Sequence, residues 1–236
     1  MKKKDFGDIT FVDLGLEDYQ KAWDYQEALF NRIITYKKTD GAGSRPDNTL
    51  IFCEHPHVYT LGKSGDEHNL LIRKDFLEEI NASYYKTNRG GDITYHGPGQ
   101  IVGYPVIDLE LFGLGLKRYI ELLEDSIIEL LERYGIASSH LEGATGVWID
   151  ADHPVKARKV CAIGVRSSRY VTMHGFALNV NTDLNYFAYI NPCGFDNKGV
   201  TSMEKELGRA QDFAKIKEEL RDIILSRLLL ERTQDH

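Results

Sequence analysis

The stretch from residue 89 to residue 108, RGGDITYHGPGQIVGYPVID, restricts the fold of the chain more than any other segment. It holds five glycines and two prolines around Arg89, Tyr95 and His96, and then continues into an apolar run. Glycine is used where a backbone turns sharply or passes close to a ligand. Polar side chains on such a loop indicate a site more than a core. A tight hairpin with an incidental histidine is the alternative, because glycine-rich loops also form ordinary turns.

The composition is that of a globular protein. Of 236 residues, 42% are hydrophobic and 11% aromatic, which is enough for a sizeable core. The net charge of −7 argues against general affinity for nucleic acid or membrane surfaces. No apolar run follows the basic start at residues 1–5, so we expect no secretory signal, and no stretch is long enough to span a bilayer.

The three cysteines lack tandem spacing, which argues against a disulfide framework and against a Cys-x-x-Cys metal site. We therefore expect reduced thiols and a cytoplasmic protein. Cys53 follows an apolar pattern and is expected to be buried. Cys193 lies between a proline and a glycine, and an exposed loop thiol is a candidate nucleophile if a neighbour lowers its pKa or removes its proton.

The EHPH run at residues 54–57 raises the question of a metal site. His55 and His57 are expected to share a face of an extended segment, but the sequence offers no convincing partner ligands. A polar loop bordering a cleft is therefore favoured over zinc.

Periodicity predicts a mixture of helices and strands. The clearest helix covers residues 116–134, where apolar residues recur at i, i+3, i+4 and i+7 before a stop at Gly135. A mixed sheet covered by helices follows from this mixture, in an α+β or α/β fold with a single catalytic domain. The other helices are expected at residues 17–36, 73–80 and 213–228, and the strands at residues 8–14, 50–53, 92–95, 100–109, 146–150, 159–166 and 170–180.

Lys159 is a candidate activator of Cys193, because it leads directly into an apolar strand and partial burial would suit it to proton transfer. Cys161 is a competing nucleophile on the same strand, which we interpret as a packing residue. His174, which precedes a glycine, is a second candidate base. The residues alone leave Cys193–Lys159 and Cys193–His174 open, and they indicate a thiol-dependent acyl transferase or hydrolase.

Six motifs occur together in an order that resembles the octanoyltransferases of lipoate biosynthesis, also called lipoyl(octanoyl) transferases. The resemblance covers about residues 50–204, and six ordered motifs are far more specific than one glycine signature. The motifs are EHPHVYTLG at 54–62, residues 89–100, GVW at 146–148, KVCAIG at 159–164, HGFALN at 174–179 and NPCG at 191–194.

The resemblance implies the catalytic-domain fold of biotin and lipoate protein ligases, an α+β fold in which a mixed β-sheet is flanked by helices, as a single domain over residues 1–236. It implies transfer of an octanoyl group from octanoyl-acyl carrier protein to a lysine amine of lipoyl domains. The acceptors would be the lipoyl domains of 2-oxo-acid dehydrogenase complexes and the glycine cleavage H protein. An enzyme of this kind is cytoplasmic, needs neither cofactor nor metal, and binds neither nucleic acid nor membrane.

The resemblance also implies roles for individual residues. Cys193 would carry the acyl group as a thioester, with Lys159 as the general acid/base. Cys161 and Met173 depart from the expected pattern, in which a small residue and an aromatic residue are usual. The implied lining of the acyl pocket is Arg89, Gly90, Gly91, Asp92, Ile93, Thr94, Tyr95, His96, Ala162, Ile163, Gly164, Gly175, Phe176 and Ala177.

Two other functions are compatible with parts of this sequence. An ATP-dependent lipoate or biotin protein ligase shares the fold but needs no nucleophilic thiol. A non-catalytic homologue that binds acyl groups or lipoyl domains would not need Cys193. Because the implied partners are acidic, we expect local basic residues to dock them. The candidates are residues 2–4, Arg73, Lys74 and residues 156–158.

Overall fold

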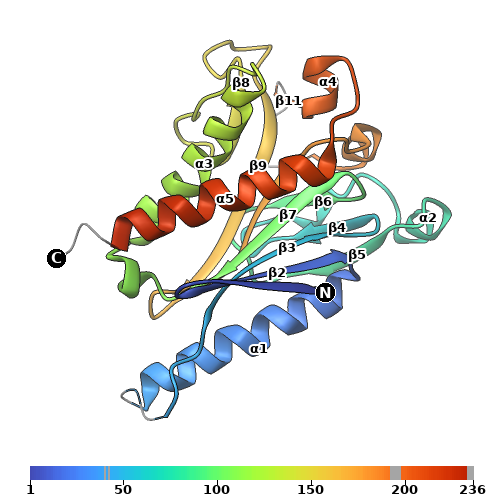
Figure 1. The fold of residues 1–236 in the computed structure, drawn as a ribbon. Helices are drawn as coiled ribbons and strands as arrows, with labels where there is room; N and C mark the ends of the chain where they lie inside the picture. Colours follow the sequence, from blue (N-terminus) through green and yellow to red (C-terminus); the bar gives the residue numbers. More distant parts are fainter. Residues whose placement is uncertain (40, 42, 192–197, 233–236) are drawn as a thin grey trace.

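The computed structural model describes residues 1–39, 41, 43–191 and 198–232 (Figure 1). These residues form one β-sheet of eight strands and one of three. In the larger sheet the order is β1 (Lys2–Phe6), β2 (Ile9–Leu16), β3 (Asn48–Glu54), β7 (Gln100–Val106), β10 (Val171–Asn179), β9 (Arg158–Ser168) and β11 (Gly199–Val200), with β8 (Val147–Ile149) paired to β9. In the smaller sheet it is β5 (Ser83–Lys86), β4 (Val58–Leu61) and β6 (Ile93–His96). Both sheets combine parallel and antiparallel pairs, so the predicted mixed sheet is confirmed.

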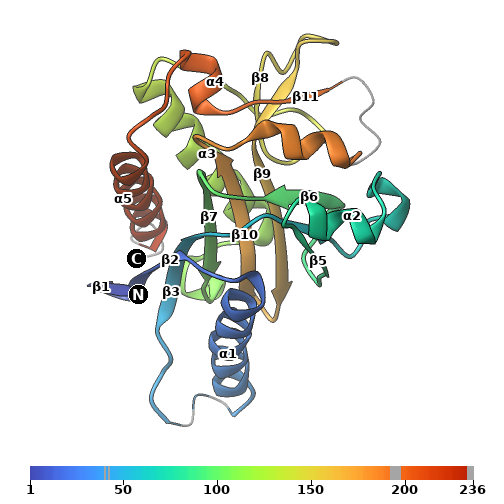
Figure 2. The same ribbon diagram turned by 90° about the vertical axis from the view of Figure 1, so that its right-hand side faces the viewer.

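Helices cover both faces of the larger sheet (Figure 2). α3 (Leu116–Arg133) and α5 (Phe213–Arg232) pack on one face, and α1 (Tyr19–Lys38) packs on the other. The alternation along β3 explains this, because Leu50 and Phe52 pack with α3 and α5 whereas Ile51 and Cys53 pack with α1. The short helical segments are α2 (Lys74–Glu79), α4 (Met203–Leu207), η1 (Glu67–Asn69), η2 (Leu109–Phe112) and η3 (Leu184–Tyr189).

The HGPG bend at residues 96–99 connects the two sheets. The strands on either side of it are confirmed, but β6 pairs with β4 in the smaller sheet and β7 pairs with β3 and β10 in the larger one. The alternative of a tight hairpin is therefore wrong. Gly99 has a φ of +78°, and a Cβ there would lie 2.5 Å from the Asn181 carbonyl oxygen, so the bend needs glycine at this position.

The predicted helices occur within a few residues of their expected bounds. α1 begins after Asp18, whose side chain accepts a hydrogen bond from the Lys21 N–H. α3 ends at Arg133, with Tyr134 as its cap and Gly135 at a φ of +75°. None of the helices within the described residues combines the length and the apolar character that a membrane crossing requires.

Candidate active site

A cavity of about 1010 Å³ is lined by residues of both sheets. β6 contributes from the smaller sheet, and β7, β9 and β10 contribute from the larger one. Thirteen of the fourteen predicted pocket residues lie in the lining that the described residues form. They are Arg89, Gly90, Gly91, Asp92, Ile93, Thr94, His96, Ala162, Ile163, Gly164, Gly175, Phe176 and Ala177.

Tyr95 is the exception, and the prediction that it lines the cavity is wrong for the described lining. Its hydroxyl lies 2.7 Å from His57 Nδ1, and its ring stacks on Tyr186 at 5.0 Å. Successive side chains of a strand point to opposite faces, so Tyr95 points away from the face of β6 that carries Thr94 and His96. It packs instead in the hydrophobic cluster of the smaller sheet.

Lys159 lies at the end of the cavity that is formed by β8, β9 and the loop before β8. Its Nζ donates a hydrogen bond to the Thr145 carbonyl oxygen at 3.0 Å. Gly146 has a φ of +120°, and a Cβ there would lie 2.5 Å from the Cys161 carbonyl oxygen and 3.4 Å from Lys159 Cδ. Glycine at position 146 therefore makes room for the lysine side chain.

Cys193 falls in the segment 192–197, which lies outside the described residues. The described residues on either side of this segment, Asn191 and Lys198, both line the cavity. Immediately after it, β11 pairs with the start of β9, with Gly199 opposite Arg158 and Val200 opposite Lys159. Residues 199 and 200, which are six and seven positions after Cys193, therefore lie beside the start of β9 and Lys159.

Cys161 is completely buried in the core beneath α3 and α5, and it is not part of the lining formed by the described residues. Burial raises the pKa of its thiol strongly, because a thiolate is poorly solvated there. The interpretation of Cys161 as a packing residue is confirmed.

His174 lines the cavity at a different place from Lys159. It pairs with Val165, six residues further along β9 than Lys159, which corresponds to roughly 20 Å at the rise of a strand. Its Nε2 lies 2.7 Å from Asn88 Oδ1, and its backbone N–H donates to Gln26 Oε1 at 2.9 Å. Burial, reinforced by the charges of nearby arginines, lowers the pKa of His174 to about 3, so the imidazole is neutral.

His96 belongs to a buried hydrogen-bonded chain along the cavity wall. Gln100 Nε2 donates to Asn179 Oδ1 at 2.8 Å, so the Gln100 carbonyl oxygen accepts from His96 Nδ1, also at 2.8 Å. His96 Nε2 is then an acceptor for the Thr60 hydroxyl at 3.3 Å, and Thr60 Oγ1 accepts from Arg89 Nη2 at 2.9 Å. Burial lowers the pKa of His96 to about 3. A neutral imidazole with both nitrogens engaged fits the cavity wall rather than proton transfer.

Sequence reasoning gave no role to Thr60, Gln100 and Asn179, although all three lie in the quoted motifs. Their spacing carries no periodic signal, and their partners lie on other strands. The available hint was the presence of uncharged hydrogen-bonding residues within otherwise apolar strands, since buried polar side chains are normally paired.

The glycines around Arg89 allow close backbone contacts. Gly90 N–H donates to the Val165 carbonyl oxygen at 2.9 Å, and a Cβ on Gly164 would lie 2.7 Å from the Gly90 carbonyl oxygen. The loop that begins at Arg89 therefore lies directly against β9. Apolar side chains that are paired across three strands, Val102, Ala177 and Ala162, complete this wall of the cavity.

The EHPH run is placed differently from the expectation of a polar loop bordering the cleft. His55 is fully buried, with Nδ1 donating to the Glu17 carbonyl oxygen at 2.7 Å and Nε2 accepting from the Tyr104 hydroxyl at 2.8 Å. His57 stacks on Tyr186 at 4.0 Å. Neither histidine is among the described residues that line the cavity. The two side chains therefore point to different surroundings and do not share a face.

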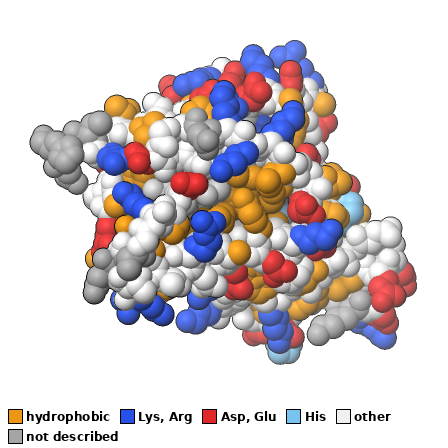
Figure 3. Space-filling model, turned by 60° about the horizontal axis from the view of Figure 1, so that its bottom comes forward, with side chains coloured by type: hydrophobic (Ala, Val, Ile, Leu, Met, Phe, Trp, Pro, Cys, Tyr) orange, Lys and Arg blue, Asp and Glu red, His pale blue; other side chains and the backbone are white. Residues whose placement is uncertain are grey.

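Two of the basic residues proposed for docking have carboxylate partners. Arg158 pairs with Glu206 at 2.6 Å, and Arg73 pairs with Asp75 at 2.7 Å. On the face shown in Figure 3, positive and negative side chains are interspersed. The exposed lysines at residues 2–4 and at position 156 are thus better candidates for docking an acidic partner than either arginine.

Comparisons with known proteins identify the family. The lipoyl protein ligase A/B catalytic domain matches residues 18–224. An octanoyltransferase of Parabacteroides distasonis is 58% identical over 217 residues, which cover 92% of this chain and 97% of that protein. The fold is that of two solved structures of low identity. A lipoate-protein ligase A bound with ATP has a TM-score of 0.62 at 13% identity, covering 94% of this chain and 85% of that one. The biotin protein ligase of Aquifex aeolicus has a TM-score of 0.50 at 14% identity, covering 94% and 70%. The chain therefore belongs to the octanoyltransferases, within the lipoyl protein ligase A/B catalytic-domain family.

Proposed function

We propose that this acyltransferase moves the octanoyl group from octanoyl-acyl carrier protein to a lysine amine of lipoyl domains through a thioester on Cys193. Lys159 acts as the general acid and base in both half-reactions. The observation that carries the proposal is the pairing of β11 with the start of β9, because Val200, seven positions after Cys193, pairs with Lys159.

Lys159 is favoured over His174 as the partner of Cys193. Lys159 Nζ and Lys198 Nζ lie 4.6 Å and 5.9 Å from the centre of the same Trp148 ring, so the described chain beyond Cys193 reaches the lysine. His174, on β10, lies opposite Val165, which is roughly 20 Å along β9 from Lys159. Its Nε2 is already hydrogen-bonded to Asn88. The low pKa of His174, about 3, also makes it a weak base for a thiol.

In the first half-reaction the Cys193 thiol gives its proton to Lys159, and the thiolate attacks the carbonyl carbon of the donor thioester. The tetrahedral intermediate collapses to the Cys193 thioester, and the carrier thiolate leaves with the proton from Lys159. Main-chain N–H groups of the glycine-rich loops stabilise the oxyanion. One thioester replaces another, so the exchange is nearly balanced in free energy and needs no ATP.

In the second half-reaction the neutral amine of the acceptor lysine attacks the Cys193 thioester. Lys159 takes the proton that the amine loses, an amide bond forms, and the Cys193 thiolate leaves and is reprotonated by Lys159. The driving force is the conversion of a thioester to an amide.

The wall between Lys159 and His174 is suited to an eight-carbon chain. The side chains of Val102, Ala177 and Ala162, which are paired across three strands, present apolar surface there. Burial of the six methylenes of an octanoyl group would contribute roughly 5 kcal/mol, at about 0.8 kcal/mol for each methylene.

The proposal extends to partners, domain and location. The donor is acyl carrier protein, and the acceptors are the lipoyl domains of 2-oxo-acid dehydrogenase complexes and the glycine cleavage H protein. Residues 1–236 act as a single catalytic domain, in support of which the family match reaches from residue 18 to residue 224. A cytoplasmic location is supported by the free, buried thiols of Cys53 and Cys161.

Intact mass after incubation with octanoyl-acyl carrier protein tests the proposal. We expect one octanoyl adduct on the wild type that hydroxylamine removes, and none on Cys193→Ser. Cys161→Ala is the matched control, because it removes a buried thiol, and it should keep the adduct. An adduct that persists in Cys193→Ser, or that maps to Cys161, would contradict the assignment of the nucleophile.

The lipoate-protein ligase A of similar fold was solved with bound ATP, so an ATP-dependent ligase is the alternative to test. That activity predicts octanoyl transfer from free octanoate with ATP, and little transfer from the carrier thioester. We expect the opposite pattern, with transfer from octanoyl-acyl carrier protein unchanged when ATP is omitted.

A further inference from the structure

A buried carboxylate lies behind the loop that holds Lys159. Glu124 belongs to α3 and is 7% exposed, and its Oε1 accepts a hydrogen bond from the Gly146 N–H at 2.7 Å. The Gly146 N–H and the Thr145 carbonyl are the two ends of one peptide bond. Lys159 Nζ donates to that carbonyl at 3.0 Å. Glu124 and Lys159 therefore bond opposite ends of a single planar unit.

This arrangement couples the carboxylate to the lysine. An acceptor on the N–H side polarises the peptide and strengthens its carbonyl as an acceptor, since hydrogen bonds in a chain reinforce one another. The plane of the peptide also fixes the direction in which the carbonyl points. Other bonds hold the same loop, with Trp148 Nε1 donating to the Ala144 carbonyl oxygen at 2.8 Å and Trp148 N–H donating to the Ser139 carbonyl oxygen at 3.0 Å.

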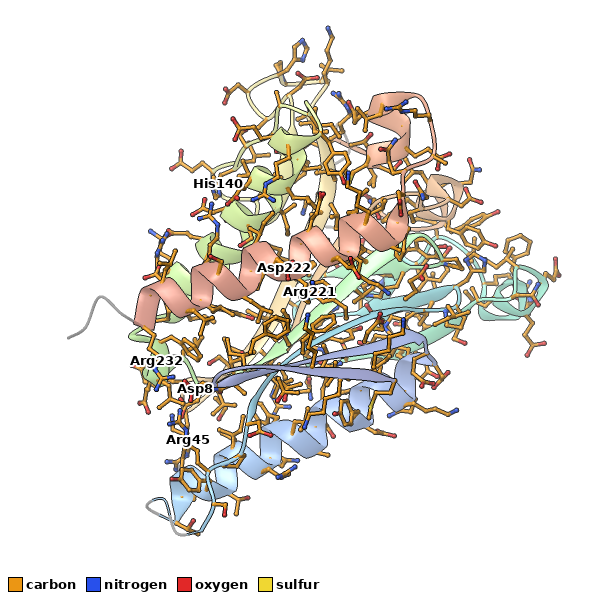
Figure 4. All side chains as sticks on the ribbon, viewed as in Figure 1. Asp8, Arg45, His140, Arg221, Asp222 and Arg232 are labelled. Carbon is orange, nitrogen blue, oxygen red and sulfur yellow. The ribbon has the colours of Figure 1, made fainter. Side chains whose placement is uncertain are left out.

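The second oxygen of the carboxylate is held by His140, which lies beside α3 (Figure 4). Glu124 Oε2 lies 2.9 Å from His140 Nδ1, and His140 Nε2 lies 3.0 Å from Asp125 Oδ1. Arg118 Nη1 lies 3.5 Å from the other oxygen of Asp125. A protonated His140 can donate to both carboxylates, whereas a neutral imidazole can donate to only one of them.

We propose that Glu124 is a positioning residue that orients the Thr145–Gly146 peptide so that its carbonyl holds Lys159 Nζ at the reacting end of the cavity. His140 secures the carboxylate in that orientation. The inference rests on the proposed role of Lys159 as general acid/base. Glu124 itself contacts neither the substrate nor the reacting atoms in this arrangement.

Three variants separate positioning from simple stability. Glu124→Ala removes the acceptor for the Gly146 N–H, and we expect the single-turnover rate of octanoyl transfer to Cys193 to fall at least tenfold with the KM for octanoyl-acyl carrier protein within threefold of wild type. Glu124→Gln keeps a carbonyl oxygen for Gly146 and should recover a rate within threefold of wild type. Glu132→Ala removes an exposed carboxylate from the same helix and should leave the rate unchanged.

The pH profile is the measurement that a purely structural role would not change. In Glu124→Ala we expect the limb of the pH–rate profile that belongs to Lys159 to move to lower pH, because the carbonyl that stabilises the ammonium form is no longer held in place. A Glu124→Ala protein whose rate and profile superimpose on those of wild type, after correction for the folded fraction, would overturn the inference. So would a Glu124→Gln protein as impaired as the alanine variant.

Two further measurements keep the test decisive. If Glu124→Ala does not fold, His140→Ala replaces it, and a rate reduced two- to fivefold is expected while the Gly146 bond stays in place. An unchanged rate would overturn the inference. NMR of the Lys159 ε-amine, labelled by reductive methylation, follows its titration without catalysis. A shifted Lys159 titration in Glu124→Ala supports the positioning role even if the wild type forms no thioester, an outcome that would defeat only the proposed function.

Discussion

Lys159 Nζ lies 4.6 Å from the centre of the Trp148 ring. The tryptophan is 2% exposed, and its indole N–H is fixed by the Ala144 carbonyl oxygen. A cation that faces an aromatic ring is stabilised by about 0.5–2 kcal/mol, depending on how well water is excluded. The ring is thus a second support for the lysine, beside the Thr145 carbonyl.

We expect Trp148→Phe to lower the free energy of unfolding by about 1–3 kcal/mol, since it removes a buried hydrogen bond and weakens the contact between ring and cation. Octanoyl transfer should slow a few-fold. Urea unfolding and single-turnover kinetics measure the two effects. Trp23→Phe is the matched control, because the buried Trp23 Nε1 has no hydrogen-bond partner among the described residues and its loss leaves no carbonyl unpaired. Equal effects of the two substitutions would contradict the role given to Trp148.

Replacement of Lys159 should affect the rate and leave substrate binding largely unchanged. A general acid/base contributes about 10²- to 10⁴-fold, so Lys159→Ala should lower kcat by at least about a hundredfold with little change in KM for the carrier protein. Lys159→Arg should not recover the rate, because a guanidinium is effectively always protonated. Lys21→Ala, which alters an exposed lysine of α1 outside the described cavity lining, serves as the control. A Lys159→Ala enzyme within tenfold of wild type would exclude this role.

Gly146→Ala should destabilise the protein and displace Lys159. At a φ of +120° an L-residue is strained, and its Cβ would lie 2.5 Å from the Cys161 carbonyl oxygen. We expect a loss of more than about 2 kcal/mol in the free energy of unfolding. Gly115→Ala is the matched control, since Gly115 has a φ of −80° and open space around its Cα. If the two alanine variants unfold at the same urea concentration, the conformational argument fails.

The buried histidines should make the fold sensitive to acid. Burial lowers the pKa of both His96 and His174 to about 3, from an ordinary value of 6.5. The unfolded chain then binds protons that the folded chain does not, so the stabilising contribution is complete above a pH of about 6.5 and is lost as the pH falls toward about 3. Urea unfolding at a series of pH values measures this slope. His96→Gln should reduce it, and a slope left unchanged by that substitution would contradict the role of His96 burial.

Sequence periodicity predicted α1, α3 and α5 well because each one buries a continuous apolar face, whereas the five-residue α4 was not predicted. α3 keeps its pattern over eighteen residues and ends beside Gly135, as expected. Seven of the eleven strands in the described residues were predicted as segments, whereas β1, β4, β5 and β11 were not, and the partners of the strands were not predicted. β6 and β7 are neighbours in sequence on either side of a glycine-rich bend, and that local pattern is the same whether the strands form a hairpin or enter two sheets.

Site residues that belong to a sequence motif could be predicted. Residues that reach the site only through tertiary contacts could not. The glycines at positions 90, 91 and 164 were expected at the cavity. A Cβ on Gly90 or Gly164 would lie within 3.0 Å of a backbone oxygen, and Gly91 has a φ of +85°. Tyr95 was wrongly included, because the motif does not reveal its contacts with His57 and Tyr186 in the hydrophobic cluster of the smaller sheet. Glu124 was not predicted at all. It is twenty-two residues from its partner Gly146, and its helix pattern shows only an occasional acidic residue on an apolar face.

The HGPG bend determines which parts of the protein a bound acyl group would stabilise. The polypeptide passes from the smaller sheet to the larger one at this bend, and residues of both sheets line the cavity, so one bound group would contact two separately hydrogen-bonded sheets. Ligand binding stabilises whatever structure it requires. Occupancy should therefore slow amide hydrogen exchange in β4 and β6 as well as in β7, β9 and β10, and the two sheets would open together as one cooperative unit.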